Sequence, residues 1–562
     1  MFLEIQILFV VILQCFMLVA HCDPLIVKTS HGILKGVVQY TFYKNKTYYA
    51  YKGIPYAQPP VGELRFREPV PMKPWPGIRT LSEKYGNPCY AFNLRPSSLA
   101  MSEDCLFLNI FTPALGKKKK SAKLAVMLFI HGGGFYQYDG SDFLFGPDFL
   151  IKQKVILVTI NYRLGPLGFF NFEERGYNGN MGFKDQLLAL TWVKKNIRNF
   201  GGDPNLITVF GESAGGVSAH LLVLNPKARS NIKRAILMSG NAFSSFAFVK
   251  GNNQLDMMRR IYQNELGNNT SGAKMLQFFK NSSIDLLVKK TPFLPPTYSI
   301  TSYWAAVVED VKKAIKPFLW QGPRKTYKKD KIHVELMCGD TSAEYLVFLT
   351  NVFGWVNPLN THFDVGLDIF PGLDIPTNST AYEIQQNKIR NFYFGSGAIS
   401  RTIESFTQYV QMMSHLILVH SSYETMMLHR HHAKTICYET DLNTTLNVIK
   451  LVLGFGPFEG MGHAEDIPYC FLSNVFRSVL NSIYTPPRNE QVIKILNFLP
   501  KVYADFAKTG SVGRFKPVTR KYNQCIGIKN DGLESIEGPR TPQNEFWSQI
   551  RKSVQPWIKK GF

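Results

Sequence analysis

The chain has 562 residues and a formal net charge of +23. Such a length could hold several domains, but strand and helix patterns alternate throughout without a linker rich in proline or serine and without a repeat, so we expect one large α/β domain. The charge distribution argues against a nucleic-acid partner, because the clearest basic runs, 117–120 and 324–331, lie in predicted loops and form no helical or aromatic-interleaved stripe. We expect a solvated basic surface, with steering toward acidic surfaces such as matrix glycans as the alternative.

The N-terminus carries an apolar stretch, residues 5–20, which ends in Ala20-His21-Cys22. This pattern predicts a signal peptide, 1–22, followed by a mature domain, 23–562, although Glu4 and the lack of an early basic residue are atypical. An uncut N-terminal anchor is the alternative, but the stretch is short for a spanning helix. Without a second membrane-length run or a lipid-anchor signal, we expect a secreted protein that does not insert stably in a membrane.

A continuously apolar run, 124–130, predicts a strand buried on both faces. It leads into His131, Gly132, Gly133 and Gly134. Three glycines let backbone N–H groups approach a substrate oxygen closely, because no side chain blocks the approach. A further strand is predicted at 155–161, before the next motif.

That motif is Gly-Glu-Ser-Ala-Gly-Gly at 211–216, which lies between a β-type run, 207–210, and a predicted helix, 217–223. The setting is typical of a nucleophile elbow, in which small residues two positions before and after the serine prevent clashes. The turn would expose Ser213 Oγ, and the N-terminal end of the helix would face a developing oxyanion. The sequence therefore predicts a nucleophilic serine.

Taken together, these motifs resemble those of the type-B carboxylesterases, the group that includes carboxylesterases, cholinesterases and insect esterases. Two further segments, 239–243 and 391–395, resemble insect esterases most. The resemblance also rests on Gly-Ile-Pro-Tyr-Ala at 53–57, Glu-Asp-Cys-Leu-Phe-Leu-Asn at 103–109, Asn-Tyr-Arg-Leu-Gly at 161–165 and Phe-Gly-Gly-Asp-Pro at 200–204.

The resemblance implies an α/β-hydrolase fold with a large, mostly parallel sheet and no metal or organic cofactor. It implies that the N–H groups of Gly133, Gly134 and Ala214 form the oxyanion hole. Ion pairs are expected between Arg65 and Glu103 and between Arg163 and Asp185, in structural rather than catalytic roles.

In this family the serine is followed along the chain by an acid and then a histidine. His463, in a glycine-flanked loop after the last predicted strand, resembles the family's histidine. The acid is expected to be Glu344, five residues after Gly339. The family usually has glycine at the next position, where this chain has Tyr345, so Asp340 stays an alternative.

A rival cluster, His429, His431 and His432, lies in a predicted helix where its spacing does not converge on one face as metal ligation would need. We interpret it as solvated helix surface. Sequons that suit an extracellular surface occur at Asn45, Asn268, Asn269, Asn281, Asn378 and Asn443.

Cys15 and Cys22 would be removed with the signal peptide. The family closes the loop between Cys89 and Cys105 with a disulfide, and the oxidising export route favours that bond. Four further cysteines have no obvious partner and are interpreted as buried free thiols: Cys338, Cys437, Cys470 and Cys525.

The expected activity is hydrolysis of small neutral, apolar carboxylic esters. The loop between the first cysteine pair has no tryptophan, whose indole face holds choline in cholinesterases. A juvenile-hormone-type esterase is an alternative, but such enzymes usually carry glutamine where this chain has Glu212. A non-catalytic adhesion or binding protein on the same fold is the alternative from another class.

Overall fold

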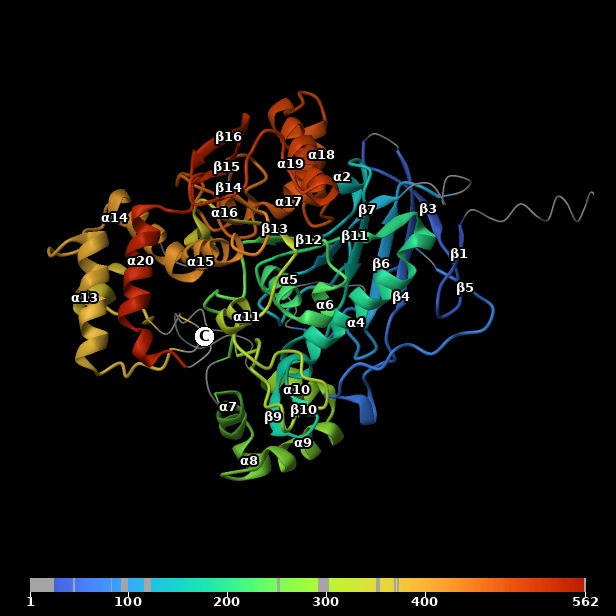
Figure 1. Ribbon diagram of the computed structural model, residues 1–562, viewed down its shortest axis with the longest axis horizontal. Coiled ribbons are helices and arrows are strands. Elements are labelled where there is room, and N and C mark those ends of the chain that lie inside the picture. Colours follow the sequence, from blue (N-terminus) through green and yellow to red (C-terminus); the bar gives the residue numbers. More distant parts are fainter. Residues whose placement is uncertain are drawn as a thin grey trace, which may run out of the picture.

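Eleven strands of the described chain form one sheet in the order β16-β15-β14-β13-β12-β11-β7-β8-β6-β4-β3 (Figure 1). The six neighbouring pairs from β15 to β8 are parallel, and the four outer pairs are antiparallel. The strands are β3 (Val37–Tyr40), β4 (Thr47–Pro55), β6 (Phe107–Thr112), β7 (Leu124–Ile130), β8 (Ile156–Ile160), β11 (Gly202–Glu212), β12 (Arg234–Met238), β13 (Glu335–Thr341), β14 (Thr435–Asp441), β15 (Gln524–Lys529) and β16 (Gly532–Glu537). The prediction of a large, mostly parallel sheet is confirmed.

This computed structural model describes residues 25–559 except 44–45, 82, 92–99, 116–122, 250–252, 292–302, 350–353, 368–369 and 371–372. The predicted signal peptide, the basic run at 117–120 and Asn45 lie outside the described residues. Two small sheets accompany the large one: β1 (Ile26–Lys28), β2 (Ile33–Lys35) and β5 (Ile78–Thr80), and β9 (Asn171–Glu174) with β10 (Tyr177–Asn178).

Helices cover both faces of the sheet. The α-helices are α2 (Asp148–Ile151), α3 (Gly165–Phe169), α4 (Met181–Asn196), α5 (Ala214–Leu224), α6 (Pro226–Arg229), α7 (Asn253–Ile261), α8 (Gln263–Leu266), α9 (Gly272–Asn281), α10 (Ile284–Lys290), α11 (Pro323–Lys329), α12 (Val356–Thr361), α13 (Thr380–Phe394), α14 (Ile403–Ser414), α15 (His420–His429), α16 (Val448–Val452), α17 (Ile467–Cys470), α18 (Arg477–Tyr484), α19 (Glu490–Thr509) and α20 (Pro542–Ser553). The 3₁₀ turns are η1 (Gly62–Leu64), η3 (Ile197–Phe200), η4 (Glu344–Phe348) and η7 (Gln555–Trp557), and η6 (His415–Val419) is a π-helical turn.

Side chains of the central strands alternate between two cores, as the two-residue period of a strand requires. In β7, Val126 and Leu128 pack in one core, whereas Met127 and Phe129 pack in the other. The first core also contains apolar side chains of α4 and α5, and the second those of α19. Burial on both faces explains why β7 is continuously apolar.

Two disulfides join described cysteines. The predicted bond between Cys89 and Cys105 is present. The interpretation of Cys437 and Cys525 as free thiols was wrong, because a disulfide joins them across the neighbouring strands β14 and β15. Cys338 and Cys470 are buried free thiols, as expected.

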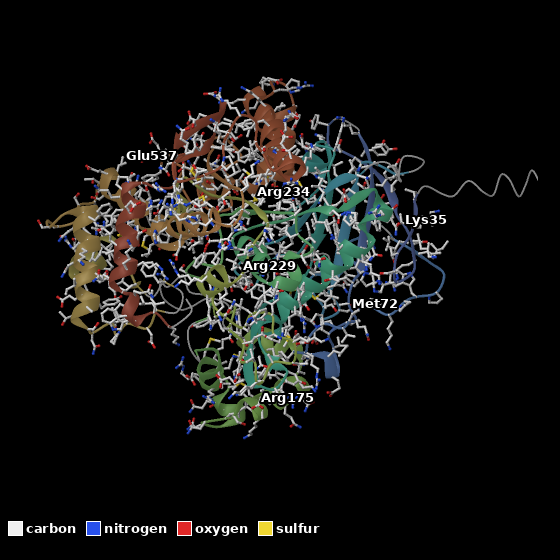
Figure 2. The ribbon with its side chains drawn as sticks, viewed as in Figure 1. Lys35, Met72, Arg175, Arg229, Arg234 and Glu537 are labelled. Atoms are coloured by element: carbon white, nitrogen blue, oxygen red, sulfur yellow. A yellow bond between two sulfur atoms is a disulfide. The ribbon has the colours of Figure 1, made fainter. Side chains whose placement is uncertain are left out.

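Basic side chains are spread over the molecule: Lys35 and Arg175, for example, lie on distant parts of it (Figure 2). Some of the positive charge is paired, since Arg229 contacts Asp330 at 2.6 Å and Arg234 contacts Glu335 at 2.6 Å. The run 324–331 was predicted as a loop, but most of it forms α11.

Among the described residues, no helix combines the length and apolarity needed to cross a membrane.

Candidate active site

Ser213 lies in a sharp turn between β11 and α5, with φ 59° and ψ −124°. Its backbone N–H donates a hydrogen bond of 2.9 Å to the carbonyl oxygen of Met238. A methyl group on Gly215 would lie 2.0 Å from the carbonyl oxygen of Ile130, and one on Gly211 would lie 2.4 Å from the backbone of Gly215. Glycine at these two positions is therefore a steric requirement of the turn, as the sequence pattern predicts.

The glycine loop after β7 packs directly on this turn. A methyl group on Gly132 would lie 2.5 Å from the carbonyl oxygen of Glu212 and 3.1 Å from Cβ of Ser213. Gly133 and Gly134 have φ angles of 89° and 59°, which favour glycine. Ala214 begins α5, where the first backbone N–H groups have no partner within a helix. The residues expected to form the oxyanion hole thus belong to two segments that meet at Ser213.

Glu344 and His463 are in direct contact. Oε2 of Glu344 lies 2.6 Å from Nδ1 of His463, and the Glu344 side chain is fully buried. Its other oxygen, Oε1, accepts hydrogen bonds of 2.7 Å from the N–H of Thr341 and 2.5 Å from Oγ of Ser239. Because both carboxylate oxygens are engaged, the orientation of Glu344 toward the imidazole is fixed.

The loop that carries His463 is tied to the end of β13. Ala343 N–H donates to the carbonyl oxygen of Met461 at 2.9 Å, and Met461 N–H donates to Oγ of Ser342 at 2.9 Å. His463 follows β14 but precedes β15 and β16, so the prediction that it comes after the last strand was wrong. Two strands at the edge of the sheet were missing from that prediction.

The second ring nitrogen of His463 faces the serine turn, because Nε2 lies 3.1 Å from Oε1 of Glu212, the residue before Ser213. Burial raises the pKa of Glu212 to about 8. Burial alone would lower the pKa of His463, but the negative charges of Glu212 and Glu344 outweigh it and raise that pKa to about 9. Burial also raises the pKa of Asp466 to about 7. These surroundings stabilise a positive charge on the imidazole.

Asp340, the alternative acid, lies in β13 and contacts α15. Its Oδ1 accepts a hydrogen bond of 2.8 Å from Oγ of Ser422 on α15. Burial raises the pKa of the Asp340 carboxyl well above its ordinary value. The contact with Nδ1 of His463 is made by Glu344. Tyr345, which replaces the glycine usual in the family, is buried, and its N–H donates to Oγ of Ser414 at 3.0 Å.

The contacts of Ser239 and Glu212 were not foreseen from the sequence. Ser239 belongs to the segment 239–243, which resembles insect esterases, and Glu212 directly precedes the predicted nucleophile. The sequence signal for both residues is their position in these motifs. The expected ion pairs are present, at 2.6 Å between Arg65 and Glu103 and at 2.7 Å between Arg163 and Asp185.

The histidine cluster divides between core and surface. His429 is fully buried, so its interpretation as solvated surface was wrong, whereas His431 is exposed. Tyr327 Oη and the Val334 carbonyl oxygen both contact the ring of His429. No group of three or more His, Cys, Asp or Glu side chains suited to a metal ion occurs among the residues that the structure describes.

The sheet, the serine turn at the end of β11 and the acid–histidine contact define an α/β-hydrolase. Residues 23–547 match the carboxylesterase family, and the chain belongs to that family. It is 28% identical to Esterase B1 of Culex pipiens over 94% of this chain and 98% of the relative. It is 29% identical to juvenile hormone esterase of Heliothis virescens, over 87% of this chain and 85% of the relative.

Esterase E4 of Myzus persicae is 31% identical over 70% of each chain. Among solved structures, the juvenile hormone esterase of Manduca sexta, with OTFP covalently attached, is similar with a TM-score of 0.80 and 25% identity. That likeness covers 95% of this chain and 100% of the other. The resemblance to insect esterases predicted from the motifs is confirmed, and membership of the family supports a carboxylic ester hydrolase.

Proposed function

We propose that this protein is a secreted serine carboxylesterase that hydrolyses neutral, apolar carboxylic esters through an acyl-enzyme. The observation that carries the proposal is the buried contact of 2.6 Å between Oε2 of Glu344 and Nδ1 of His463. The other ring nitrogen of His463 faces the serine turn. A carboxylate at Nδ1 fixes the histidine tautomer that leaves Nε2 free to accept a proton.

In the proposed mechanism, Nε2 of His463 takes the hydroxyl proton of Ser213, and Oγ attacks the ester carbonyl carbon. The N–H groups of Gly133, Gly134 and Ala214 hold the oxyanion of the tetrahedral intermediate, each contributing about 3 kcal/mol in comparable sites. The alcohol leaves with the proton from His463. Water then attacks the acyl-enzyme by the same route and releases the carboxylic acid.

The environment of the histidine favours this cycle. His463 must carry a positive charge in each transition state, and Glu344 and Glu212 lie against its two ring nitrogens. Ser239 donates to Glu344 and leaves the second carboxylate oxygen for the imidazole. The positive charge therefore develops between preorganised partners.

Secretion is part of the proposal, with 1–22 removed as a signal peptide and 23–562 as the mature enzyme. The two disulfides suit an oxidising compartment. The described sequon asparagines, which are Asn268, Asn269, Asn281, Asn378 and Asn443, are all exposed and are proposed glycosylation sites. Asn45 is proposed on its sequon alone.

Juvenile hormone, a neutral apolar methyl ester, is a second candidate substrate. The similarity to juvenile hormone esterases of Heliothis virescens and Manduca sexta favours it. We rank it below a general carboxylesterase role, because juvenile hormone esterases usually carry glutamine at the position of Glu212.

The proposal is tested by labelling the secreted protein with an organophosphate and locating the adduct by mass spectrometry. We expect one labelled serine, Ser213, and a loss of p-nitrophenyl butyrate turnover in Ser213→Ala of about 10⁴- to 10⁶-fold. Ser230→Ala, at an exposed serine on the surface, is the matched control and should keep full turnover. Turnover that survives Ser213→Ala would refute the mechanism and favour a binding protein on this fold.

A further inference from the structure

A chain of buried hydrogen bonds runs behind the serine turn. The Ala242 N–H contacts Nδ1 of His220 at 3.0 Å, and Nε2 of His220 contacts Oη of Tyr327 at 2.8 Å. The same hydroxyl contacts Nδ1 of His429 at 2.9 Å, and Nε2 of His429 contacts the carbonyl oxygen of Val334 at 2.7 Å. The three side chains come from α5, α11 and α15 and are buried.

The two end groups of this series of hydrogen bonds fix the position of every hydrogen within it. An amide N–H can only donate, so Nδ1 of His220 accepts and Nε2 carries the proton that it donates to Tyr327. A carbonyl oxygen can only accept, so Nε2 of His429 donates to it and Nδ1 accepts from the Tyr327 hydroxyl. Both imidazoles must be neutral. Burial accordingly lowers the pKa of His220 well below its ordinary value and that of His429 to about 4.

Ala242 ends a turn, 239–242, that touches both the nucleophile and the acid. A methyl group on Gly240 would lie 2.1 Å from the carbonyl oxygen of Ser213, so the backbone of this turn rests on the serine turn. Ser239 Oγ donates to Glu344 Oε1 at 2.5 Å. On its other side, the turn is held to α15 by Asn241, whose Nδ2 donates to Oγ of Ser421 at 2.8 Å.

We propose that His220 is a positioning residue, which holds the turn 239–242 against Ser213 and Glu344 through its acceptor at Nδ1, in the tautomer that Tyr327 and His429 fix. The inference rests on the proposed serine mechanism. In this role His220 acts through the backbone of Ala242 and takes no part in the bond-making steps. If that hydrogen bond is lost, the turn shifts, and the distances that Ser239 and Gly240 maintain are lost with it.

The test compares two substitutions at His220. His220→Asn keeps a carbonyl oxygen close to the place of Nδ1, where it can accept from Ala242, whereas His220→Leu has a similar bulk and no acceptor. We expect His220→Leu to lower kcat for p-nitrophenyl butyrate about tenfold with KM little changed, because small displacements of catalytic groups cost up to roughly 10²-fold. His220→Asn should stay within about threefold of wild type, because it keeps an acceptor for the Ala242 N–H and loses only the hydrogen bond to Tyr327.

Tyr327→Phe provides an independent variant, because it removes the hydroxyl that links the two histidines. The His220 ring still contacts the Ala242 N–H, but its tautomer and orientation are no longer fixed by Tyr327. We expect a fall in kcat of several-fold, without a change in KM. If His220→Leu is not secreted in folded form, Tyr327→Phe decides. His431→Asn, at the exposed histidine, is the control and should match wild type.

Equal losses in His220→Asn and His220→Leu, or wild-type kcat in Tyr327→Phe, would overturn the inference. Ser213→Ala separates this failure from failure of the proposed function. If Ser213→Ala abolishes turnover while the network variants behave as wild type, only the positioning role is refuted. If Ser213→Ala keeps full turnover, the serine mechanism itself is refuted.

Discussion

Nε2 of His463 lies 3.1 Å from Oε1 of Glu212, within the buried site. The nitrogen proposed to receive the serine proton is thus flanked by a second carboxyl, which belongs to the residue before the serine. This relationship links the pH dependence of the reaction to the charge of Glu212.

We expect Glu212→Gln to shift the acid limb of the pH profile of kcat/KM to lower pH. His463 acts as a base only when neutral, and the Glu212 charge raises its pKa, so removing that charge keeps the imidazole neutral at lower pH. An opposite charge at this distance typically shifts a pKa by about one unit or more. Glu534→Gln, at an exposed position, is the control. An unchanged limb, or one moved to higher pH, would show that Glu212 does not act on the base.

The identity of the acid is tested by comparing Glu344→Gln with Asp340→Asn. Loss of the carboxylate that fixes a catalytic histidine costs about 10⁴-fold in a comparable triad. We expect a loss of that order for Glu344→Gln and less than about tenfold for Asp340→Asn, whose carboxyl accepts from Ser422. The measurement is kcat for p-nitrophenyl butyrate at fixed pH. The reverse ranking would assign the role to Asp340.

Gly215→Ala should destabilise the enzyme, although alanine in place of glycine stabilises an ordinary helix by about 1 kcal/mol. The added methyl group would lie 2.0 Å from the carbonyl oxygen of Ile130, so strand β7 or the serine turn must move. We expect a thermal midpoint several degrees lower and a large loss of turnover. Gly397→Ala, where the added methyl meets open space, is the control. A midpoint equal to wild type would contradict the proposed steric requirement.

Mass spectrometry of the secreted protein should find Asp23 at the N-terminus. Non-reduced peptides should join Cys89 to Cys105 and Cys437 to Cys525. Cys338 and Cys470 should react with iodoacetamide only after unfolding, because both are buried. Retention of residues 1–22 would argue for an uncut anchor, and free thiols at the paired positions would contradict export through an oxidising compartment.

We expect kcat/KM for naphthyl or p-nitrophenyl butyrate to exceed that for acetylthiocholine and butyrylthiocholine. An indole face contributes up to about 2 kcal/mol to binding of a desolvated quaternary ammonium group. The segment between Cys89 and Cys105 contains no tryptophan, and Arg95 in it would repel a cation. Most of that segment, including Arg95, lies outside the described residues. Equal or higher kcat/KM for the choline esters would refute the proposed substrate class but not the serine mechanism.

Local patterns in the sequence determined the strand β7, the serine turn and the glycine loop. Each depends on neighbours along the chain: continuous apolarity for burial on both faces, and glycine where a side chain would strike the backbone. The resemblance to the family added the prediction of an α/β-hydrolase sheet and of His463 as the histidine. Of the two missed strands, β16 lies at the edge of the sheet, where its solvent-facing residues interrupt the apolar pattern, and β15 pairs with it.

Only the tertiary structure decided which distant groups meet. Glu344 and Asp340 lie four positions apart near the end of β13, and contact with a loop 119 residues away distinguishes them. The bond between Cys437 and Cys525, 88 residues apart, requires the register of β14 on β15. His429, on α15, is buried because Tyr327 of α11 and Val334, the residue before β13, both contact its ring. Local sterics and periodicity specify backbone conformation, whereas side-chain partners depend on strand register and helix packing over the whole chain.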